Sequence, residues 1–427
     1  MMPYKVLALI VDVTLDNIDQ KQEGKTMNKG KLLVGIDVGC RTHHVAIGEN
    51  EGIAEEFQIT HDSQGFQHLF AQIANQQKRQ KLTKVIIGME GTNGYARPLD
   101  QLIKQKRYTL LNVNNLKLAR FKEIFATPAK TDNLDAKTIL LMMKMAPQME
   151  QIKESLQEVY DIAETEQQLK KISRRRRQLT NDKVVIQNRM QADLQAVCPG
   201  LLDTIKQIDA NYVLNFLSNQ KDLKKLAKLK PEKLQKIRGI GKGHAAKLSN
   251  WQNTAFFGPE IDWVGPMIHE DAKRILELKK SITELEKQMG KLVRESRLAK
   301  LLESIPGFGT VCAAEVAGEI GNIERFKSEA GLAIYLGLAP LDNSSGNYQG
   351  TKSPKQVNKR AKAAMIVAMS HNIRYVERSK TYYDKKRSEG KKHNQALRSL
   401  GRHMVRVIWS MVKNDCTYEN RLGAKAA

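Results

Sequence analysis

The chain is 427 residues long, 41% of them hydrophobic, and it carries 70 Lys and Arg against 46 Asp and Glu, a formal net charge of +24. This length and composition predict about two to four domains with real cores and exclude a disordered tail. The excess positive charge favours a polyanionic partner such as nucleic acid. The four cysteines lack the spacing of a disulfide framework or a zinc site, which suits a reducing cytoplasm. No apolar run approaches the roughly 18 residues of a membrane span, so we expect no membrane partner.

The first third of the chain is expected to fold around a β-sheet. Residues 1–30 are expected to be a poorly ordered extension, and Met27 is a plausible effective start. Residues 31–147 alternate short β-rich runs with helical ones, a pattern typical of an α/β domain. The expected strands cover residues 32–38, 44–48, 84–89 and 108–113, and the expected helices cover residues 98–106 and 131–145.

Residues 148–300 are expected to form a helical, coiled-coil region. Apolar residues recur every three or four positions within residues 151–197 and 271–297, which predicts two long helices that pair. They could pair as an antiparallel hairpin in one chain or as a seam between chains, and residues 201–266 form a smaller helical insert. The first long helix contains a run of Arg174, Arg175, Arg176 and Arg177. This run either binds a nucleic-acid backbone or forms a solvated face.

Residues 301–427 are expected to form a third domain, basic and mainly helical. From Thr351 to the end, 19 Lys or Arg stand against 5 Asp or Glu, so the polyanion is expected to lie against this part. Lys359 and Arg360, at the start of an alanine-rich helix, are candidate nucleic-acid ligands.

Two glycine-rich turns are similar to the helix-hairpin-helix turn, which presents backbone N–H groups and a helix N-terminus to a phosphate. The first covers residues 305–309 and includes Gly307 and Gly309, and a looser second copy covers residues 237–243. Each could also be a plain glycine helix stop, a reading that is weaker for the first copy. Neither turn would read base sequence.

Four acidic residues stand at positions that suit a shared site. Asp37 and Glu90 each end a hydrophobic strand, and glycines flank them, which we expect to let a charged ligand approach the backbone. Asp132 and Asp135 are three residues apart on an expected helix, so they project from one face. Close carboxylates raise each other's pKa unless cations neutralise them, and Mg²⁺ prefers such oxygen ligands. A pair of these ions would support phosphoryl transfer of the nuclease type.

Other readings of these acids remain open. A strand that ends in Gly-x-Asp-x-Gly also occurs in actin-like ATPases, and an Asp-x-x-Asp pair is often a solvated helix face. The joint order Asp, Glu, Asp-x-x-Asp favours the metal site, and no second phosphate loop or adenosine-pocket pattern supports an ATPase.

Taken together, the motifs resemble the DEDD transposases of the insertion sequence 110 family, and in particular its 1111 subgroup. The N-terminal resemblance lies in GIDVG at 35–39, GMEGTNGYARPL at 88–99 and KTDNLDAKTI at 130–139. The C-terminal resemblance lies in residues 303–328, GLAIYLGLAP at 331–340, SSG at 344–346 and NKRAKAAMIVAM at 358–369. It covers most of the chain and implies a RuvC-like (RNase H-like) domain followed by a helical transposase domain.

The resemblance also implies the roles of particular residues. Asp37, Glu90, Asp132 and Asp135 would bind two Mg²⁺ ions, and Ser345, or the adjacent Ser344, would be the catalytic serine. On composition alone Ser345 reads as an ordinary turn residue. Similar recombinases are guided by a non-coding RNA that pairs with donor and target DNA. Their active sites form between subunits, which implies a dimer or tetramer, located in the bacterial cytoplasm at the nucleoid.

We therefore expect an RNA-guided, Mg²⁺-dependent DNA recombinase in which Ser345 attacks the DNA backbone. One alternative is a RuvC-like, structure-specific junction nuclease, which would use the four acids and water alone. A second is a non-catalytic nucleic-acid-binding scaffold with a degenerate metal site. A Ser345→Ala variant separates the recombinase from the nuclease, because a hydrolase should tolerate the change.

Overall fold

The computed structural model of the chain describes residues 30–49, 52–91, 94–124, 132–355 and 357–419. Met27 and nearly all of the expected N-terminal extension lie outside these residues. The chain divides into two compact units, here called the sheet unit, up to Tyr160, and the helical unit, from Asp161 onward.

A six-stranded mixed sheet forms the centre of the sheet unit, with strand order β3-β2-β1-β4-β5-β6. β1, β4 and β5 are parallel, whereas β2 runs antiparallel to β1, β3 to β2 and β6 to β5. The strands are β1 (Lys31–Val38), β2 (Thr42–Glu49), β3 (Gly52–Thr60), β4 (Lys84–Glu90), β5 (Thr109–Val113) and β6 (Leu156–Glu158). The sheet confirms the expected α/β class, and β3 and β6 are additions to the predicted strands.

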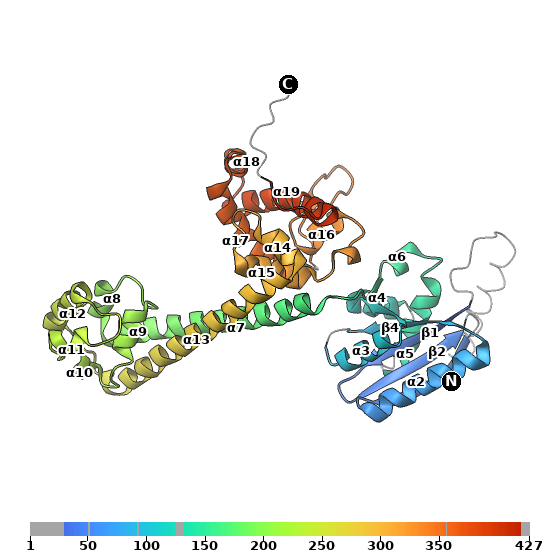
Figure 1. Cartoon of the computed structure of the whole chain (residues 1–427), viewed down its shortest axis with the longest axis horizontal. Helices are drawn as coiled ribbons and strands as arrows, with labels where there is room; N and C mark the ends of the chain where they lie inside the picture. Colours follow the sequence, from blue (N-terminus) through green and yellow to red (C-terminus); the bar gives the residue numbers. More distant parts are fainter. Residues whose placement is uncertain (1–29, 50–51, 92–93, 125–131, 356, 420–427) are drawn as a thin grey trace, which may run out of the picture. The chain divides into compact units, whose positions relative to one another are not determined.

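Helices cover both faces of this sheet (Figure 1). α2 (Ser63–Gln80) and α3 (Arg97–Gln105) pack on one face, and α4 (Asn115–Glu123) and α5 (Asp132–Met145) pack on the other. A short helix, α6 (Glu150–Lys153), precedes β6. Successive side chains of a strand point to opposite faces, so β1 contributes alternate apolar residues to the two cores.

Glycines in the two central strands let α5 lie directly on the sheet. Gly35 of β1 and Gly88 of β4 are partners in the parallel register. A Cβ at Gly35 would lie 2.3 Å from the backbone oxygen of Ala136, and a Cβ at Gly88 would lie 2.4 Å from the Sδ of Met143. The sequence-based expectation that these two glycines admit a ligand was therefore wrong, because the space above them holds α5.

Gly35→Ala is expected to destabilise the sheet unit. The new methyl group would meet helix backbone, which cannot swing aside as a side chain can, so we expect a loss of about 1–3 kcal/mol in the free energy of unfolding. Urea denaturation followed by circular dichroism measures it. Gly52→Ala is the matched control, because a Cβ there meets nothing within 4 Å. Equal midpoints for the two variants would contradict the packing argument.

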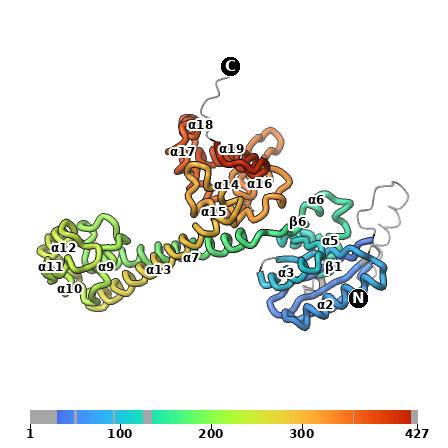
Figure 2. Tube along the Cα trace, viewed as in Figure 1, coloured from blue at the N-terminus to red at the C-terminus, as the bar shows by residue number. Residues whose placement is uncertain are grey.

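Two long helices form the axis of the helical unit. α7 (Glu164–Val197) and α13 (Ile261–Glu295) lie side by side along much of their length (Figures 1 and 2). Arg176 pairs with Glu286, and Arg189 pairs with Asp271 further along, so the residue numbers run in opposite directions. The helices therefore form an antiparallel pair within one chain, which resolves the alternative that the sequence left open.

The helical insert closes one end of this pair. Its helices are α8 (Pro199–Thr204), α9 (Asn211–Leu217), α10 (Leu223–Leu226), α11 (Pro231–Gln235) and α12 (Lys242–Thr254). They enclose a core of their own, in which Phe216 and Trp251 meet edge to face with ring centroids 5.9 Å apart. The ends of α7 and α13 that face the insert also contribute to this core.

The rest of the helical unit packs around the other part of the long pair. Its elements are α14 (Arg297–Glu303), α15 (Thr310–Ile320), the 3₁₀ helix η1 (Ile323–Arg325), α16 (Glu329–Tyr335), β7 (Leu341–Asp342), β8 (Thr351–Lys352), α17 (Lys359–Tyr375), α18 (Glu377–Ser388) and α19 (His393–Asn414). The small residues of α15 let it approach α7 closely, since a Cβ at Gly318 would lie 2.5 Å from the backbone nitrogen of Lys170. None of the described helices combines the length and apolar character that a membrane crossing needs.

Candidate active site

Three of the four predicted acids come together at one edge of the sheet. Asp37 and Glu90 lie at the carboxyl ends of the neighbouring parallel strands β1 and β4, where Ile36 and Met89 are the last register partners. Asp135 reaches the same point from the first turn of α5. One carboxylate oxygen from each acid lies within 4.8 Å of those of the other two. This group is called the carboxylate cluster below.

Asp132 begins α5, but its side chain lies outside the described residues. Its place in the cluster therefore stays a prediction, based on its spacing of three from Asp135.

The carboxylate cluster is electrostatically strained. Burial raises the pKa of the Glu90 carboxyl above its ordinary value, and the nearby charges of Asp37 and Asp135 raise it further. Lys122 on α4 acts in the opposite direction, because its ammonium lowers that pKa and lies 2.5 Å from an Oδ2 oxygen of Asp135. Lys122 was not predicted, because no motif in the sequence distinguishes it from Lys117, the other lysine of α4.

The donor set suits a hard divalent cation. All three groups offer carboxylate oxygens, they are only partly buried, and no Cys or His belongs to this cluster as described. Mg²⁺ binds such ligands while it keeps several waters, whereas structural zinc sites favour sulfur and imidazole nitrogen. The residues therefore fit the divalent metal that the sequence predicts.

Ser345 lies at the tip of a small β-hairpin in the helical unit. β7 and β8 pair at its base, and Ser345 and Tyr348 exchange two backbone hydrogen bonds of 3.0 Å each near its end. Gly346 between them has a φ of 53°, which a glycine adopts without strain. The serine is exposed, so the hairpin presents it to solvent. The nucleophilic role of Ser345, or of Ser344 beside it, stays a prediction.

A buried polar network fixes the two ends of the segment that carries this hairpin. The Tyr335 carbonyl accepts a 2.8 Å hydrogen bond from the Asn358 backbone N–H, and the Asn358 Nδ2 donates to the Glu319 carboxylate at 2.7 Å. Arg174 of α7 donates to both oxygens of the same carboxylate, at 2.6 and 2.9 Å. Burial alone would raise the pKa of Glu319, but the hydrogen bonds from Arg174 and Asn358 leave it below its ordinary value.

The arginine run of α7 is largely engaged within the chain. Besides Arg174, Arg177 pairs with the Glu315 carboxylate through two hydrogen bonds of 2.6 Å, and Arg176 pairs with Glu286. Only Arg175 of the four has no ion pair among the described residues, and it donates to the Gln178 side chain at 3.0 Å. A nucleic-acid contact by this run stays a prediction, for which Arg175 is the exposed member without an ion pair among the described residues.

The remaining predicted nucleic-acid ligands lie in the turn before α15 and in the first turn of α17. Gly309 is the exposed N-cap of α15, whereas Gly307 packs against α17, where an added Cβ would lie 2.4 Å from the Asn372 backbone nitrogen. Lys359 and Arg360 are exposed in the first turn of α17. Their contacts with nucleic acid stay predictions.

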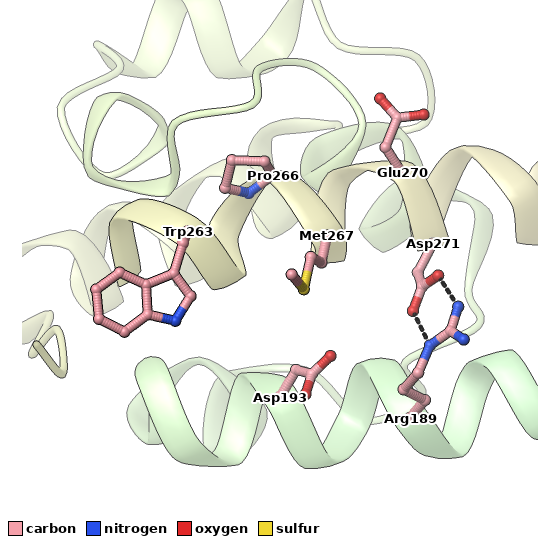
Figure 3. A pocket seen from close by; sticks show the side chains of 7 residues that line it. All are labelled: Arg189, Asp193, Trp263, Pro266, Met267, Glu270 and Asp271. Atoms are coloured by element: carbon pink, nitrogen blue, oxygen red, sulfur yellow. Dashed lines mark hydrogen bonds and ion pairs between the residues drawn. The ribbon is translucent and has the colours of Figure 1, made fainter. Parts of the chain in front are cut away.

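A hollow of about 560 Å³ lies beside the long helix pair, near the insert (Figure 3). Trp263 and Met267 are exposed beside it, and Arg189 and Asp271 form an ion pair at its edge. This lining offers no nucleophile or metal cluster, so the carboxylate cluster and the serine hairpin remain the candidate catalytic groups.

Comparison with known proteins gives two family matches and several relatives. A family model for DEDD transposases of IS110 type, described as "Transposase", matches residues 34–199. A second, described as "Transposase IS116/IS110/IS902 family", matches residues 299–384. Together the two segments span more than half of the chain.

Three relatives illustrate the similarity. The chain is 31% identical to the insertion element IS900 uncharacterized 42 kDa protein of Mycobacterium paratuberculosis, over 43% of this chain and 46% of that protein. It is 33% identical to the insertion element IS110 uncharacterized 43.6 kDa protein of Streptomyces coelicolor, over 38% and 40%. It is 25% identical to the transposase for insertion sequence element IS1111A of Coxiella burnetii, over 35% and 42%. The chain thus spans less than half the length of each of these relatives.

The two family matches take in the segment with the carboxylate cluster and the segment with Ser345. On this evidence the chain belongs to the IS116/IS110/IS902 family of transposases.

Proposed function

We propose that this protein is an insertion-sequence transposase that cuts and rejoins DNA in a metal-dependent reaction. The observation that carries the proposal is the carboxylate cluster, in which oxygens of Asp37, Glu90 and Asp135 lie within 4.8 Å of one another. The strand order β3-β2-β1-β4-β5, with acids at the ends of β1 and β4, supports an RNase H-like (RuvC-like) assignment. Membership of a transposase family supports the same activity.

The carboxylate cluster is the proposed holder of two Mg²⁺ ions, with Asp132 as a fourth ligand. When bound, the metal would neutralise the acids and polarise the scissile phosphate as a Lewis acid. Lys122 contacts Asp135 at the edge of the cluster, so its positive charge neutralises part of the negative charge of the carboxylates.

Ser345 is the proposed nucleophile. Its Oγ would attack the phosphorus of the scissile phosphodiester and form a P–O bond, while the bond to one deoxyribose oxygen breaks. The hydroxyl proton passes to solvent, and the departing oxygen takes up a proton from solvent. The product is a phosphodiester between the serine and DNA, so a hydroxyl of another DNA strand can displace the serine without ATP. The exposed hairpin tip supports this role, because Ser345 can meet a phosphate without disturbing a core.

Ser345→Ala is expected to abolish strand exchange. Because the variant loses the attacking oxygen, the rate should fall by at least about a thousandfold, while DNA binding stays unchanged. The measurement uses DNA that carries the element ends, Mg²⁺ and a gel that resolves covalent protein–DNA adducts. Ser344→Ala is the matched control, since it changes the adjacent serine in the same exposed turn.

The outcomes separate the proposal from its alternatives. Full strand exchange by Ser345→Ala, with loss in Ser344→Ala, would move the nucleophile to Ser344. Cleavage without adduct or rejoining in both variants would instead indicate a junction nuclease that uses water. Binding without any cleavage by the unaltered protein, in the presence of Mg²⁺ and guide RNA, would leave only a scaffold role.

The proposed partners are the DNA of the element ends and target, a guide RNA, and further copies of the chain in a dimer or tetramer. The net charge of +24 supports a polyanionic partner. A ribonuclease-treated preparation that keeps full strand exchange would exclude the guide RNA. The bacterial nucleoid is the proposed location, because the substrate is DNA.

A further inference from the structure

The helical insert carries a strongly charged surface that the proposed chemistry does not use. Residues 221–247 contain ten Lys or Arg and two acidic residues. Eight of these cations are exposed and form no ion pair within the described part of the chain, and seven of the eight lie within residues 228–247. These seven insert cations are Lys228, Lys230, Lys233, Lys236, Arg238, Lys242 and Lys247.

Other cations of the same unit are neutralised by acids of the chain. Arg174 and Arg177 form ion pairs with buried glutamates, and Arg402 forms one with Glu329. The insert cations lie close together in the sequence without such partners, so they repel one another in the free protein. A surface of this kind gains free energy when a polyanion covers it and releases its counterions.

The second glycine-rich turn lies in the middle of these cations and is rigidly held. Ile237 and Ile240 are buried in the insert core, and Asn215 donates a 2.8 Å hydrogen bond to the Arg238 carbonyl. Gly241 and Gly243 are exposed, and a Cβ at either position would meet nothing within 4 Å. The backbone at the start of α12 is therefore open to a ligand, whereas Gly239 earlier in the turn packs against Tyr212.

The first glycine-rich turn, which the sequence favoured, is covered closely at Gly307, whereas its Gly309 is as open as Gly241. The Pro306 carbonyl accepts a 2.6 Å hydrogen bond from the Asn372 side chain, and a Cβ at Gly307 would lie within 2.8 Å of the Ala368 backbone oxygen. α17 therefore covers this turn on one side. Both turns leave their second glycine open, and the copy in the insert also lies among the unpaired insert cations.

We propose that the insert surface, residues 228–247, binds the phosphodiester backbone of a nucleic-acid duplex without reading its sequence. Lys236, Arg238 and Lys242 flank the open turn and would make the central phosphate contacts, since unpaired cations bind backbone charge. The proposal rests on the proposed function only in choosing nucleic acid over other polyanions. Residues 200–298 lie outside both family matches, so these matches assign the insert no role.

The test replaces Lys236, Arg238 and Lys242 together by Gln in the full chain. Binding to a duplex DNA of arbitrary sequence, and to a duplex RNA of the same sequence, is measured across a series of salt concentrations. For DNA, the slope of log K against log salt should become shallower by about 2–3, because each lost phosphate contact contributes about 0.9. The matched control replaces Lys273, Lys280 and Lys287 of α13, three exposed lysines outside the insert, and should leave the slope unchanged.

The two nucleic acids distinguish the source of the phosphates. A shallower slope for DNA alone assigns the insert to DNA, and one for RNA alone assigns it to RNA. An unchanged slope for both would overturn the proposal.

Acetylation of lysines in the unaltered protein gives a second measurement that needs no variant. Bound duplex should protect Lys236 and Lys242 from acetylation, and undiminished labelling of these two lysines would also overturn the proposal. Ser345→Ala should keep the full salt slope, so failure of the serine chemistry and failure of this inference are separate results.

Discussion

Glu90→Gln is expected to abolish DNA strand cleavage while it stabilises the metal-free protein. The change keeps the size of the side chain but removes one charge from the carboxylate cluster. A metal ligand lost from a catalytic site should cost at least about a hundredfold in rate, and direct titration should show weaker Mg²⁺ binding. In the absence of metal, repulsion from Asp37 and Asp135 disappears, so thermal unfolding should occur at the same or a higher temperature.

The pH dependence of stability provides a further check on Glu90. Its pKa is raised in the folded protein, so the folded state holds this proton more tightly than the unfolded state does. The stabilisation that protonated Glu90 gives to the folded state is therefore fully present below the ordinary pKa of 4.5. It is lost as pH rises through the higher folded value. The free energy of unfolding of the metal-free protein should therefore fall by this amount as pH rises, and that of Glu90→Gln should not.

Glu56→Gln is the matched control for this experiment. Glu56 lies in β3 of the same sheet and pairs with Lys137 at 2.7 Å, outside the cluster. It should leave cleavage unchanged and alter stability by no more than about 1 kcal/mol. Unimpaired cleavage by Glu90→Gln would remove Glu90 from the site, and a destabilised metal-free Glu90→Gln protein would show that the acid has a structural role.

Arg174→Met is expected to destabilise the helical unit by about 3 kcal/mol. The Glu319 side chain is fully buried, at 0% exposure, whereas Arg174 remains 41% exposed. Removal of the arginine leaves a buried carboxylate that keeps the Asn358 hydrogen bond and the nearby charge of Lys170 but loses its ion pair, and breaking such a pair typically costs about 3–5 kcal/mol. Water that reaches the vacated arginine position should keep the loss near the lower end. Urea denaturation of the full chain measures it.

Two companion variants make this prediction specific. Glu319→Met combined with Arg174→Met should recover much of the lost stability, because both charges leave together. Lys413→Met is the surface control: Lys413 pairs with Glu324 at 2.8 Å, both side chains are well exposed, and the cost should be about 0–1 kcal/mol. An equal cost for Arg174→Met and Lys413→Met would contradict the argument.

The Arg174–Glu319 pair should also respond to acid. The pKa of Glu319 is lowered in the folded protein, so its contribution is present above the ordinary value of 4.5 and is lost as pH falls through the lower folded value. The difference in free energy of unfolding between the wild-type protein and Arg174→Met should therefore shrink as pH falls through the same range.

The strands and the acids at their ends could be predicted because local pattern determines them. Continuous apolar runs end at Asp37 and Glu90, and parallel neighbours carry such ends to one edge of a sheet. β3 was missed because its polar residues suit an exposed strand that pairs on one side only. Lys122 could not be found, because only the packing of α4 against α5 brings it to Asp135.

The arginine run and the glycine-rich turns show where local pattern is insufficient. Four consecutive cations look like a binding surface, yet Glu319 and Glu315 lie more than a hundred residues away in the sequence and engage two of them. In the same way, the better-matching turn at Gly307 is covered by α17, a helix about sixty residues further on. Long-range contacts, which no spacing reveals, decided which of these motifs stayed open.

The antiparallel pair of α7 and α13 also has a consequence for the order of folding. The insert core draws only on residues 186–276, so it can form early from contacts that are near in sequence. Its formation reverses the chain direction and brings Leu169 within reach of Met289, residues that would otherwise meet only by closing a much longer loop. We therefore expect the insert to fold first and the two long helices to pair outward from it, so that the serine-bearing part of the chain completes its own core only afterwards.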